Sequence, residues 1–129
     1  MLRKRLGIEA IERDWTHCIG NVGHYFKIPS TLIVPKSVKR IGGWAFWCCG
    51  ELEEVVMSDG IEEIGDHAFN GCKKLEKVVI SESVEYIGIS SFCWCNEAVV
   101  TLKKPRSEFN FIATNAFNSC KGVKEKVRN

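Results

Sequence analysis

The sequence has no apolar stretch long enough to cross a membrane. Its longest uncharged runs are near 12 residues, as in residues 15–26, whereas a spanning helix needs about 20. The opening residues are basic, but Glu9, Glu12, Arg13 and Asp14 interrupt the apolar core that a signal peptide requires. No Asn-x-Ser/Thr acceptor for glycosylation is present either. These absences predict a cytoplasmic protein, or a surface or secreted one if the chain is part of a longer polypeptide.

Residues that carry chemistry are few and scattered. The three histidines, His17, His24 and His67, come without a matching acid and nucleophile. No Cys-x-x-Cys pair is present, which argues against a zinc site. The glycines at residues 42–43 are typical of a tight corner and form no phosphate-binding loop. We therefore expect no enzymatic activity, no metal and no cofactor.

An internal repeat with a period of 23 residues dominates the sequence. Three ladders share this period: Ile41, Ile64 and Ile87; Phe46, Phe69 and Phe92; Cys49, Cys72 and Cys95. A fourth, looser copy with Ile112, Phe117 and Cys120 follows 25 residues later. Such periodicity is the signature of stacked repeats, in which each unit covers the apolar side of the next.

One unit, residues 52–75, predicts a short strand, a turn, a second extended piece and a short helix. Apolar residues alternate over 52–57, and residues 58–60 form a turn signal. Apolar residues over 68–75 fall at the three and four spacing of a helix. Stacked about 4.8 Å apart, such units place Phe on Phe, Ile on Ile and Cys on Cys.

The consensus of this unit points to a family. Residues 52–75 read Leu-x-x-Val-x-Met-x-x-x-Ile-x-x-Ile-Gly-x-x-Ala-Phe-x-x-Cys-x-x-Leu, and residues 34–46 read Val-Pro-Lys-Ser-Val-Lys-Arg-Ile-Gly-Gly-Trp-Ala-Phe. This pattern resembles the BspA-type leucine-rich repeat over about residues 30–123. The resemblance implies an α/β fold, a right-handed strand-helix leucine-rich-repeat solenoid used for binding, and it brings no catalytic residues. We expect three regular 23-residue repeats and one degenerate repeat.

The degenerate last unit departs from the others in two ways. It has Ala113 where the other units have glycine, and it carries two extra residues around 103–107. Either Val100 and Leu102 or their polar neighbours face inward, and burying the apolar pair costs less.

The seven cysteines do not read as a disulfide framework. Cys49, Cys72, Cys95 and Cys120 recur once per unit at a buried position, and an odd total leaves one thiol over. We expect a cysteine-rich core of reduced thiols. Disulfides between adjacent units and a metal site built from cysteines and histidines are the weaker alternatives.

The two ends fall outside the regular repeat. Residues 1–29 carry apolar side chains on one face of a predicted helix, which we interpret as a cap on the solenoid of residues 30–123. This segment could instead be a degenerate repeat, bind a partner or a membrane surface, or cover the sheet face. Residues 124–129 are predicted to be a frayed basic tail. An open C-terminal end near Phe117 and Val123 would favour self-association.

Charge is distributed unevenly along the chain. The net charge is +5 over residues 1–50, −8 over 51–97 and +5 over 98–129. Stacking places opposite charges side by side, for example Arg40 beside Glu63, so the acidic middle is interpreted as a solvated face, with an acidic docking site as the alternative. Nucleic acid is not expected as a partner, because the repeats carry the wrong sign of charge.

The outer face of the repeat sheet is the main candidate binding surface. If Val55 and Met57 point inward, Val56 points outward, as do its equivalents in the neighbouring units. The outward set is Ile33, Val56 and Val79, flanked by Glu54 and Lys77. We interpret it as a recognition strip for another protein. The alternative is the general preference of strands for β-branched residues.

A second candidate patch consists of aromatic residues that the repeat does not require. These are Trp44, Trp47, His67 and Trp94. They either form an interface or fill gaps between stacked units. The sequence thus predicts a non-enzymatic protein-protein interaction scaffold, or alternatively a module of a larger cell-surface or secreted adhesin-like repeat protein.

Overall fold

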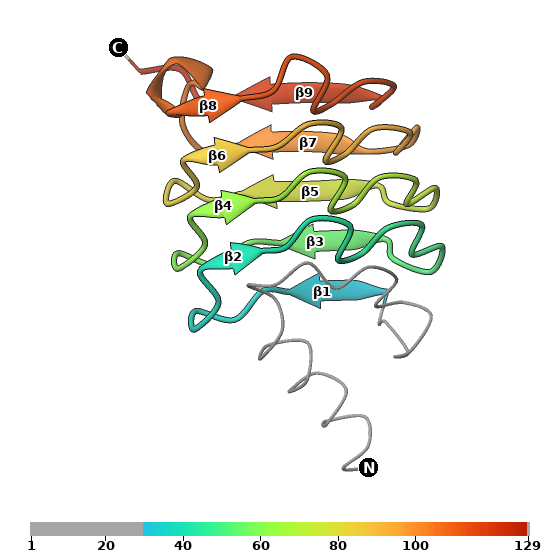
Figure 1. The fold of residues 1–129 in the computed structure, drawn as a ribbon. Helices are drawn as coiled ribbons and strands as arrows, with labels where there is room; N and C mark the ends of the chain where they lie inside the picture. The colour runs from blue at the N-terminus through green and yellow to red at the C-terminus, as the bar shows by residue number, and fades with distance from the viewer. Residues whose placement is uncertain (1–29, 129) are drawn as a thin grey trace.

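The computed structural model describes residues 30–128, which wind into a β-solenoid of about four coils. Each complete coil contributes one strand to sheet A and one shorter strand to sheet B, and a final strand after the fourth coil makes sheet A five-stranded and leaves sheet B four-stranded (Figure 1). Sheet A holds, in spatial order, β1 (Thr31–Ile33), β3 (Glu54–Val56), β5 (Lys77–Ile80), β7 (Val99–Leu102) and β9 (Gly122–Glu125). Sheet B holds β2 (Arg40–Ile41), β4 (Glu63–Ile64), β6 (Tyr86–Ile87) and β8 (Phe111–Ile112).

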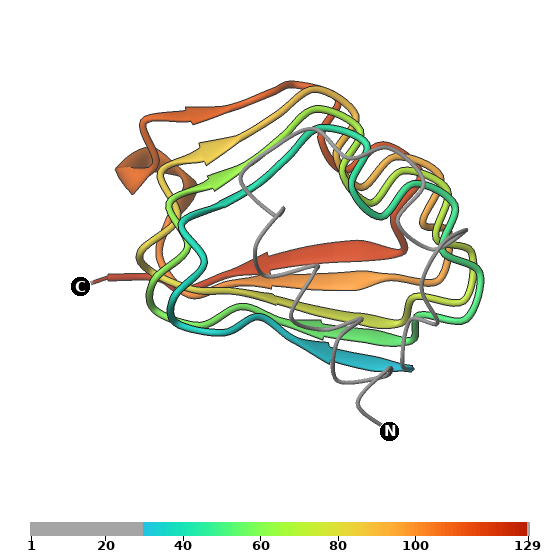
Figure 2. The same ribbon diagram turned by 60° about the horizontal axis from the view of Figure 1, so that its bottom comes forward.

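The third side of each coil is a run of turns, and we call the segments 43–48, 66–71, 89–94 and 114–119 the turn side. A view closer to the stacking direction shows the coils superimposed, with sheet A, sheet B and the turn side enclosing the interior (Figure 2). The predicted repeat architecture is therefore confirmed as a stack of coils with a spacing of about 23 residues.

Both sheets are parallel and keep the register that the period predicts. Val55 lies opposite Leu32 on one side and Val78 on the other. In the irregular unit, Val100 and Leu102 are the buried residues of β7, as the cost of burying their polar neighbours predicts. Arg40 is the register partner of Glu63, which confirms that stacking places opposite charges side by side.

Aromatic stacking runs through the middle of the core. The ring centroids of Phe46 and Phe69 are 5.1 Å apart, and those of Phe69 and Phe92 are also 5.1 Å apart. In the last coil the Phe92–Phe117 distance widens to 5.8 Å and the rings tilt by 22°. The repeated phenylalanine therefore forms one continuous ladder, which loosens at the irregular unit.

The predicted short helix in each unit is wrong for the described residues, because the turn side has a different hydrogen-bonding pattern. Within a coil, Trp47 N donates to Trp44 O across three residues, whereas the next amide, Cys48 N, donates to Asn70 O of the neighbouring coil. An α-helix would keep all these bonds within one segment. The inward spacing of three and four is retained, because successive three-residue turns present apolar side chains at similar intervals. The only helical element in the described chain is a 3₁₀ turn, η1 (Arg106–Glu108).

Left-handed backbone conformations enforce this arrangement. The φ angles of Trp44 and Cys48 are 64° and 55°, and the equivalent His67 and Gly71 have 58° and 82°. A residue with positive φ interrupts a right-handed helix, and side chains other than glycine adopt it at a cost. Two such residues interrupt the turn side in each of the first three coils, and Ser119 (φ 72°) interrupts it in the fourth, so a helix cannot propagate there.

The recurring cysteines form a second ladder beside the phenylalanines. The Cys72 thiol donates to the carbonyl oxygen of Phe46 (3.2 Å), and Cys95 and Cys120 repeat this bond to Phe69 and Phe92 (3.1 and 3.3 Å). All six cysteines in the described chain are free thiols. The prediction of a core of reduced thiols is therefore confirmed for these six, and the thiols of Cys72, Cys95 and Cys120 each bond one coil to the preceding one.

This ladder predicts a loss of stability at alkaline pH. Burial raises the pKa of the Cys120 thiol to about 12, whereas the thiol of an unfolded chain ionises near pH 8.5. Between these values the unfolded state loses its proton first, so unfolding becomes more favourable by about 1.4 kcal/mol per pH unit. In urea unfolding, raising the pH from about 8 to about 10 should cost the wild type roughly 1–2 kcal/mol more than Cys120→Ala. Equal losses would contradict this assignment.

The structure describes residues 30–128, so it can be compared with the prediction for the C-terminal end but not with that for the N-terminal end. The predicted helical cap, residues 1–29, lies outside the described residues. The prediction of a frayed tail from residue 124 does not hold for the part that is described. Strand β9 runs to Glu125, and Arg128 forms ion pairs with Glu82 and Glu108. Parallel pairing with β7 and these charges order the segment.

Candidate binding surfaces

The outer face of sheet A carries the predicted recognition strip in register. Ile33, Val56 and Val79 are successive register partners on β1, β3 and β5. Ile33 is 67% exposed, and the two valines are half-buried. The structure thus brings the three predicted apolar residues together in one row on the outside of the sheet.

The two flanking residues of this strip contact each other. Glu54 and Lys77 form the adjacent row, and their side chains make an ion pair of 3.8 Å. Exposed pairs of this kind contribute only about 0.2–1 kcal/mol. Beyond Val79 the same row continues with Thr101 and Lys124, so its apolar part is confined to the first three strands.

The predicted tryptophan patch is divided by the structure. Trp44 stacks on His67 with ring centroids 4.1 Å apart and meets Trp47 edge-on at 5.6 Å. His67 Nδ1 also accepts a hydrogen bond from the Asn70 amide. Trp94 is 58% exposed and makes no ring contact within the described chain. Three of the four residues therefore form one cluster, in which the stack of Trp44 on His67 joins two neighbouring coils.

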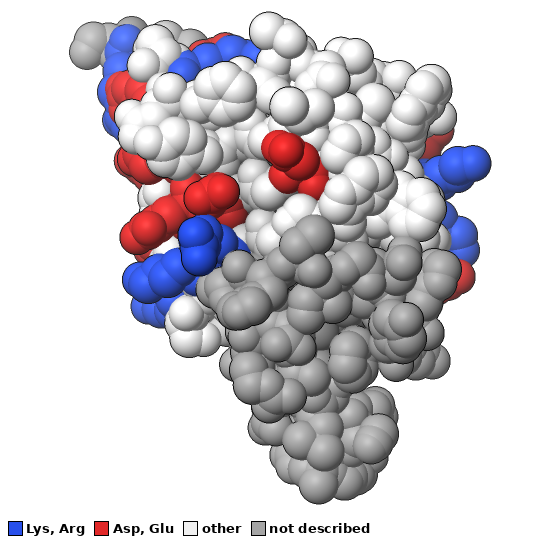
Figure 3. All heavy atoms as spheres, viewed as in Figure 1, with Lys and Arg blue, Asp and Glu red and all other residues white. Residues whose placement is uncertain are grey.

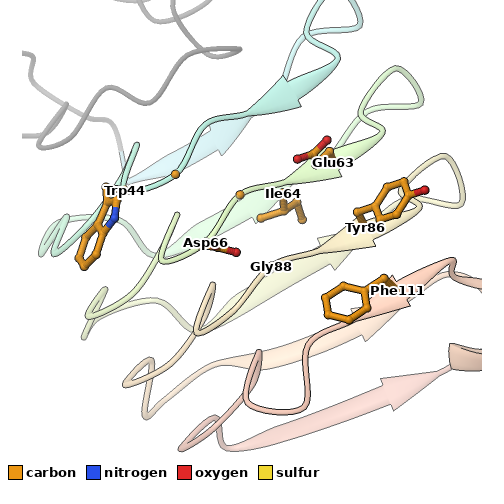
Figure 4. Close-up of a pocket in the computed structure, with 9 residues that line it drawn as sticks. Trp44, Glu63, Ile64, Asp66, Tyr86, Gly88 and Phe111 are labelled. Atoms are coloured by element: carbon orange, nitrogen blue, oxygen red, sulfur yellow. The ribbon is translucent and has the colours of Figure 1, made fainter.

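Sheet B carries a third surface that the sequence analysis missed. An open groove of about 590 Å³ crosses its outer face (Figure 4). Its lining residues come from four successive coils: Gly43, Trp44, Glu63, Ile64, Gly65, Asp66, Tyr86, Gly88 and Phe111. Position in the repeat could have revealed it, because Glu63, Tyr86 and Phe111 each precede a ladder isoleucine and therefore point outward.

Glycines make this groove hollow. Gly65 and Gly88 lie on its floor, where successive coils approach too closely for a side chain. Around them stand the rings of Trp44, Tyr86 and Phe111. A backbone floor between exposed rings is a concave surface, which is the usual form of a small binding site.

Cations pack on rings at the C-terminal end of the solenoid. Lys104 Nζ lies 3.2 Å from a Glu85 oxygen and 4.7 Å from the centroid of the Phe109 ring. Arg106 pairs with Glu125 at 3.5 Å, and its guanidinium lies 5.8 Å from the Phe117 centroid. The extra residues of the last unit thus partly cover the end of the phenylalanine ladder. This cover leaves less exposed apolar surface at the C-terminal end, where self-association is predicted.

The described residues contain no cluster of three or more His, Cys, Asp or Glu side chains that could hold a metal ion. Within residues 30–128, no helix has the length and apolar character needed to cross a membrane.

Stacked parallel coils with exposed sheet faces define a solenoid repeat protein. Comparison with known families assigns it further: the model for the "BspA type Leucine rich repeat region (6 copies)" matches residues 24–124. The chain therefore belongs to the BspA-type leucine-rich repeat family, and the resemblance found in the sequence is confirmed. This family points to a non-enzymatic repeat protein with an interaction or adhesin-like role.

Among solved structures, the fold is similar to a leucine-rich cell surface protein from Faecalibacterium prausnitzii. The TM-score is 0.59 and the sequence identity 22% over 78% of this chain. The chain covers 33% of the length of that protein. At this identity the similarity concerns the fold. No curated protein matches the sequence.

Proposed function

We propose that the chain is a non-enzymatic protein-interaction module that binds its partner through the outer face of sheet A. The observation that supports this most is the row of Ile33, Val56 and Val79 on the outside of a parallel sheet, held in register, with Ile33 exposed and the two valines half-buried. Parallel sheets are usually covered on both faces, so an uncovered apolar row is a natural interaction surface. Membership of a repeat family without catalytic residues agrees with this role.

The alternative is a module of a larger cell-surface or secreted adhesin-like protein. Two observations favour it: the similar solved structure is a cell surface protein, and the present chain covers 33% of that protein's length. In this case the same sheet face would bind an extracellular partner. A cytoplasmic scaffold remains the function proposed from the sequence.

The sheet face is tested by a double substitution, Val56→Lys/Val79→Lys. Two charges in the row should weaken partner capture from a host lysate at least about tenfold, because an apolar contact is replaced by buried charge. The control is Asn96→Lys/Asn118→Lys, which adds the same charge at exposed positions of other segments. Circular dichroism and thermal melts must first show that both variants fold like the wild type. Equal capture by both variants would exclude the sheet face as the binding surface.

A further inference from the structure

The sheet B groove combines exposed rings with acidic side chains. Trp44, Tyr86 and Phe111 are 39%, 46% and 51% exposed, although large apolar residues are usually buried. Glu63 and Asp66 are the charged residues among those that line the groove. The groove is thus aromatic and negatively charged, a combination that suits a cation.

Within the described chain, Glu63 and Asp66 form no ion pair with a base. Arg40 is the register partner of Glu63, but the structure shows no ion pair between Arg40 and any described residue. Asp66 uses one oxygen to accept the amide of Ile89 (2.9 Å) and is otherwise exposed. On the corresponding face, acidic atoms near the centre stand in a largely uncharged surface, whereas those toward the left edge lie beside Lys or Arg atoms (Figure 3).

Elsewhere in the same chain, a basic side chain contacts both a carboxylate and an aromatic ring. At the C-terminal end, Lys104 lies between the carboxylate of Glu85 and the Phe109 ring, and Arg106 contacts Glu125 and the Phe117 ring in the same way. In the groove, Glu63 and the ring of Tyr86 are register partners without an intervening cation from a lining residue.

The dimensions of the groove indicate how that cation is presented. The groove extends over four coils, from Trp44 to Phe111, which at about 4.8 Å per coil spans roughly 14 Å. An extended peptide of about four residues has this length. A guanidinium suits the site better than an ammonium, because it is planar, stacks on rings and binds a carboxylate through two nitrogens.

We propose that the sheet B groove binds an extended peptide segment that carries an arginine, with the guanidinium stacked on Tyr86 and paired with Glu63. This inference rests on the proposed role as a protein-interaction module, but it does not depend on the apolar row of sheet A. It assigns a separate surface and a chemical class of partner.

The test is calorimetric titration of the full chain with the peptide acetyl-Leu-Arg-Leu-Gly-amide. Its matched control peptide replaces arginine by citrulline, which has the same shape without the charge. We expect the wild type to bind the arginine peptide at least about fivefold more tightly than the citrulline peptide, with the difference decreasing at high salt. Glu63→Gln should abolish that preference, and Tyr86→Ala should weaken binding of the arginine peptide at least about fivefold.

Two control variants separate this proposal from the proposed function. Trp94→Ala removes an exposed ring outside the groove, and Val56→Lys/Val79→Lys alters sheet A; both should bind the arginine peptide like the wild type. Equal binding of the two peptides, no binding of either, or an unaltered preference in Glu63→Gln would overturn the proposal. A dimer seen by sedimentation that Glu63→Gln dissociates would identify a second copy as the occupant and would also overturn it. Glu63 is partly exposed, and glutamine has nearly the same size, so Glu63→Gln is expected to fold. If Tyr86→Ala does not fold, the Glu63→Gln result alone decides the test.

Discussion

A Phe69→Ala variant is expected to lose about 3–5 kcal/mol of unfolding free energy. Phe69 is fully buried and stacks on Phe46 and Phe92, one in each neighbouring coil. Removing its ring leaves a cavity that neither neighbour can fill, because the hydrogen bonds of two sheets hold the coils at a fixed spacing. The loss approaches the total stability of a small domain.

Equilibrium denaturation followed by circular dichroism measures this loss. The matched control is Phe117→Ala, at the end of the ladder, where the ring is half-buried and the stacking distance is longer. It should cost clearly less than Phe69→Ala. A change at the exposed Glu62 should lie within about 0.5 kcal/mol of the wild type. If Phe69→Ala unfolds at the wild-type denaturant concentration, the ladder does not carry the stability of the solenoid.

A Gly65→Ala variant is expected to lose about 3 kcal/mol, at the upper end of the usual cost of overpacking. A Cβ atom at this position would lie 2.6 Å from Gly43 N, 2.8 Å from Gly42 C and 2.9 Å from Ile41 O. All three are backbone atoms of the preceding coil, and Gly65 N itself donates to Ile41 O (2.8 Å). Relief of the clash would therefore require the backbones of the two coils to move apart locally.

The last coil contains an alanine at the position that Gly65 occupies in its own coil. Ala113 occupies the equivalent position there and still donates to Ile87 O (2.9 Å), in the coil whose phenylalanine has the longer, tilted stacking contact. A terminal coil can shift outward, whereas the coil of Gly65 is held on both sides.

Thermal melts of Gly65→Ala and Gly50→Ala form the comparison for this prediction. A Cβ atom at Gly50 meets no atom within 4 Å, so its replacement should leave the melting temperature nearly unchanged. Equal melting temperatures for the two variants would show that the coils can separate at little cost.

Most of the stacking could be predicted from the sequence, because a repeat constrains itself. The 23-residue spacing of isoleucine, phenylalanine and cysteine places equivalent side chains on one another in any solenoid, whatever the path of the chain between them. The inward orientation of Val100 and the register of Arg40 opposite Glu63 followed from the same alternation and period.

The turn side could not be predicted in this way. Apolar residues at three and four spacing are compatible both with a helix and with successive three-residue turns. The choice depends on whether an amide such as Cys48 N finds its acceptor within its own coil or in the next one, at Asn70 O. That acceptor lies 22 residues away in the sequence, so no local pattern encodes it.

The groove of sheet B also depends on contacts between residues that are distant in the sequence. Trp44 and Phe111 are separated by 67 positions, and neither belongs to the repeat consensus. They line one groove because parallel stacking places their coils within a few strand spacings, and because glycine at the corners leaves the space between them open. The repeat thus encodes the stack and its core, since both follow from periodicity, whereas the hydrogen-bond partners of the turns and the shape of the groove arise from contacts between coils.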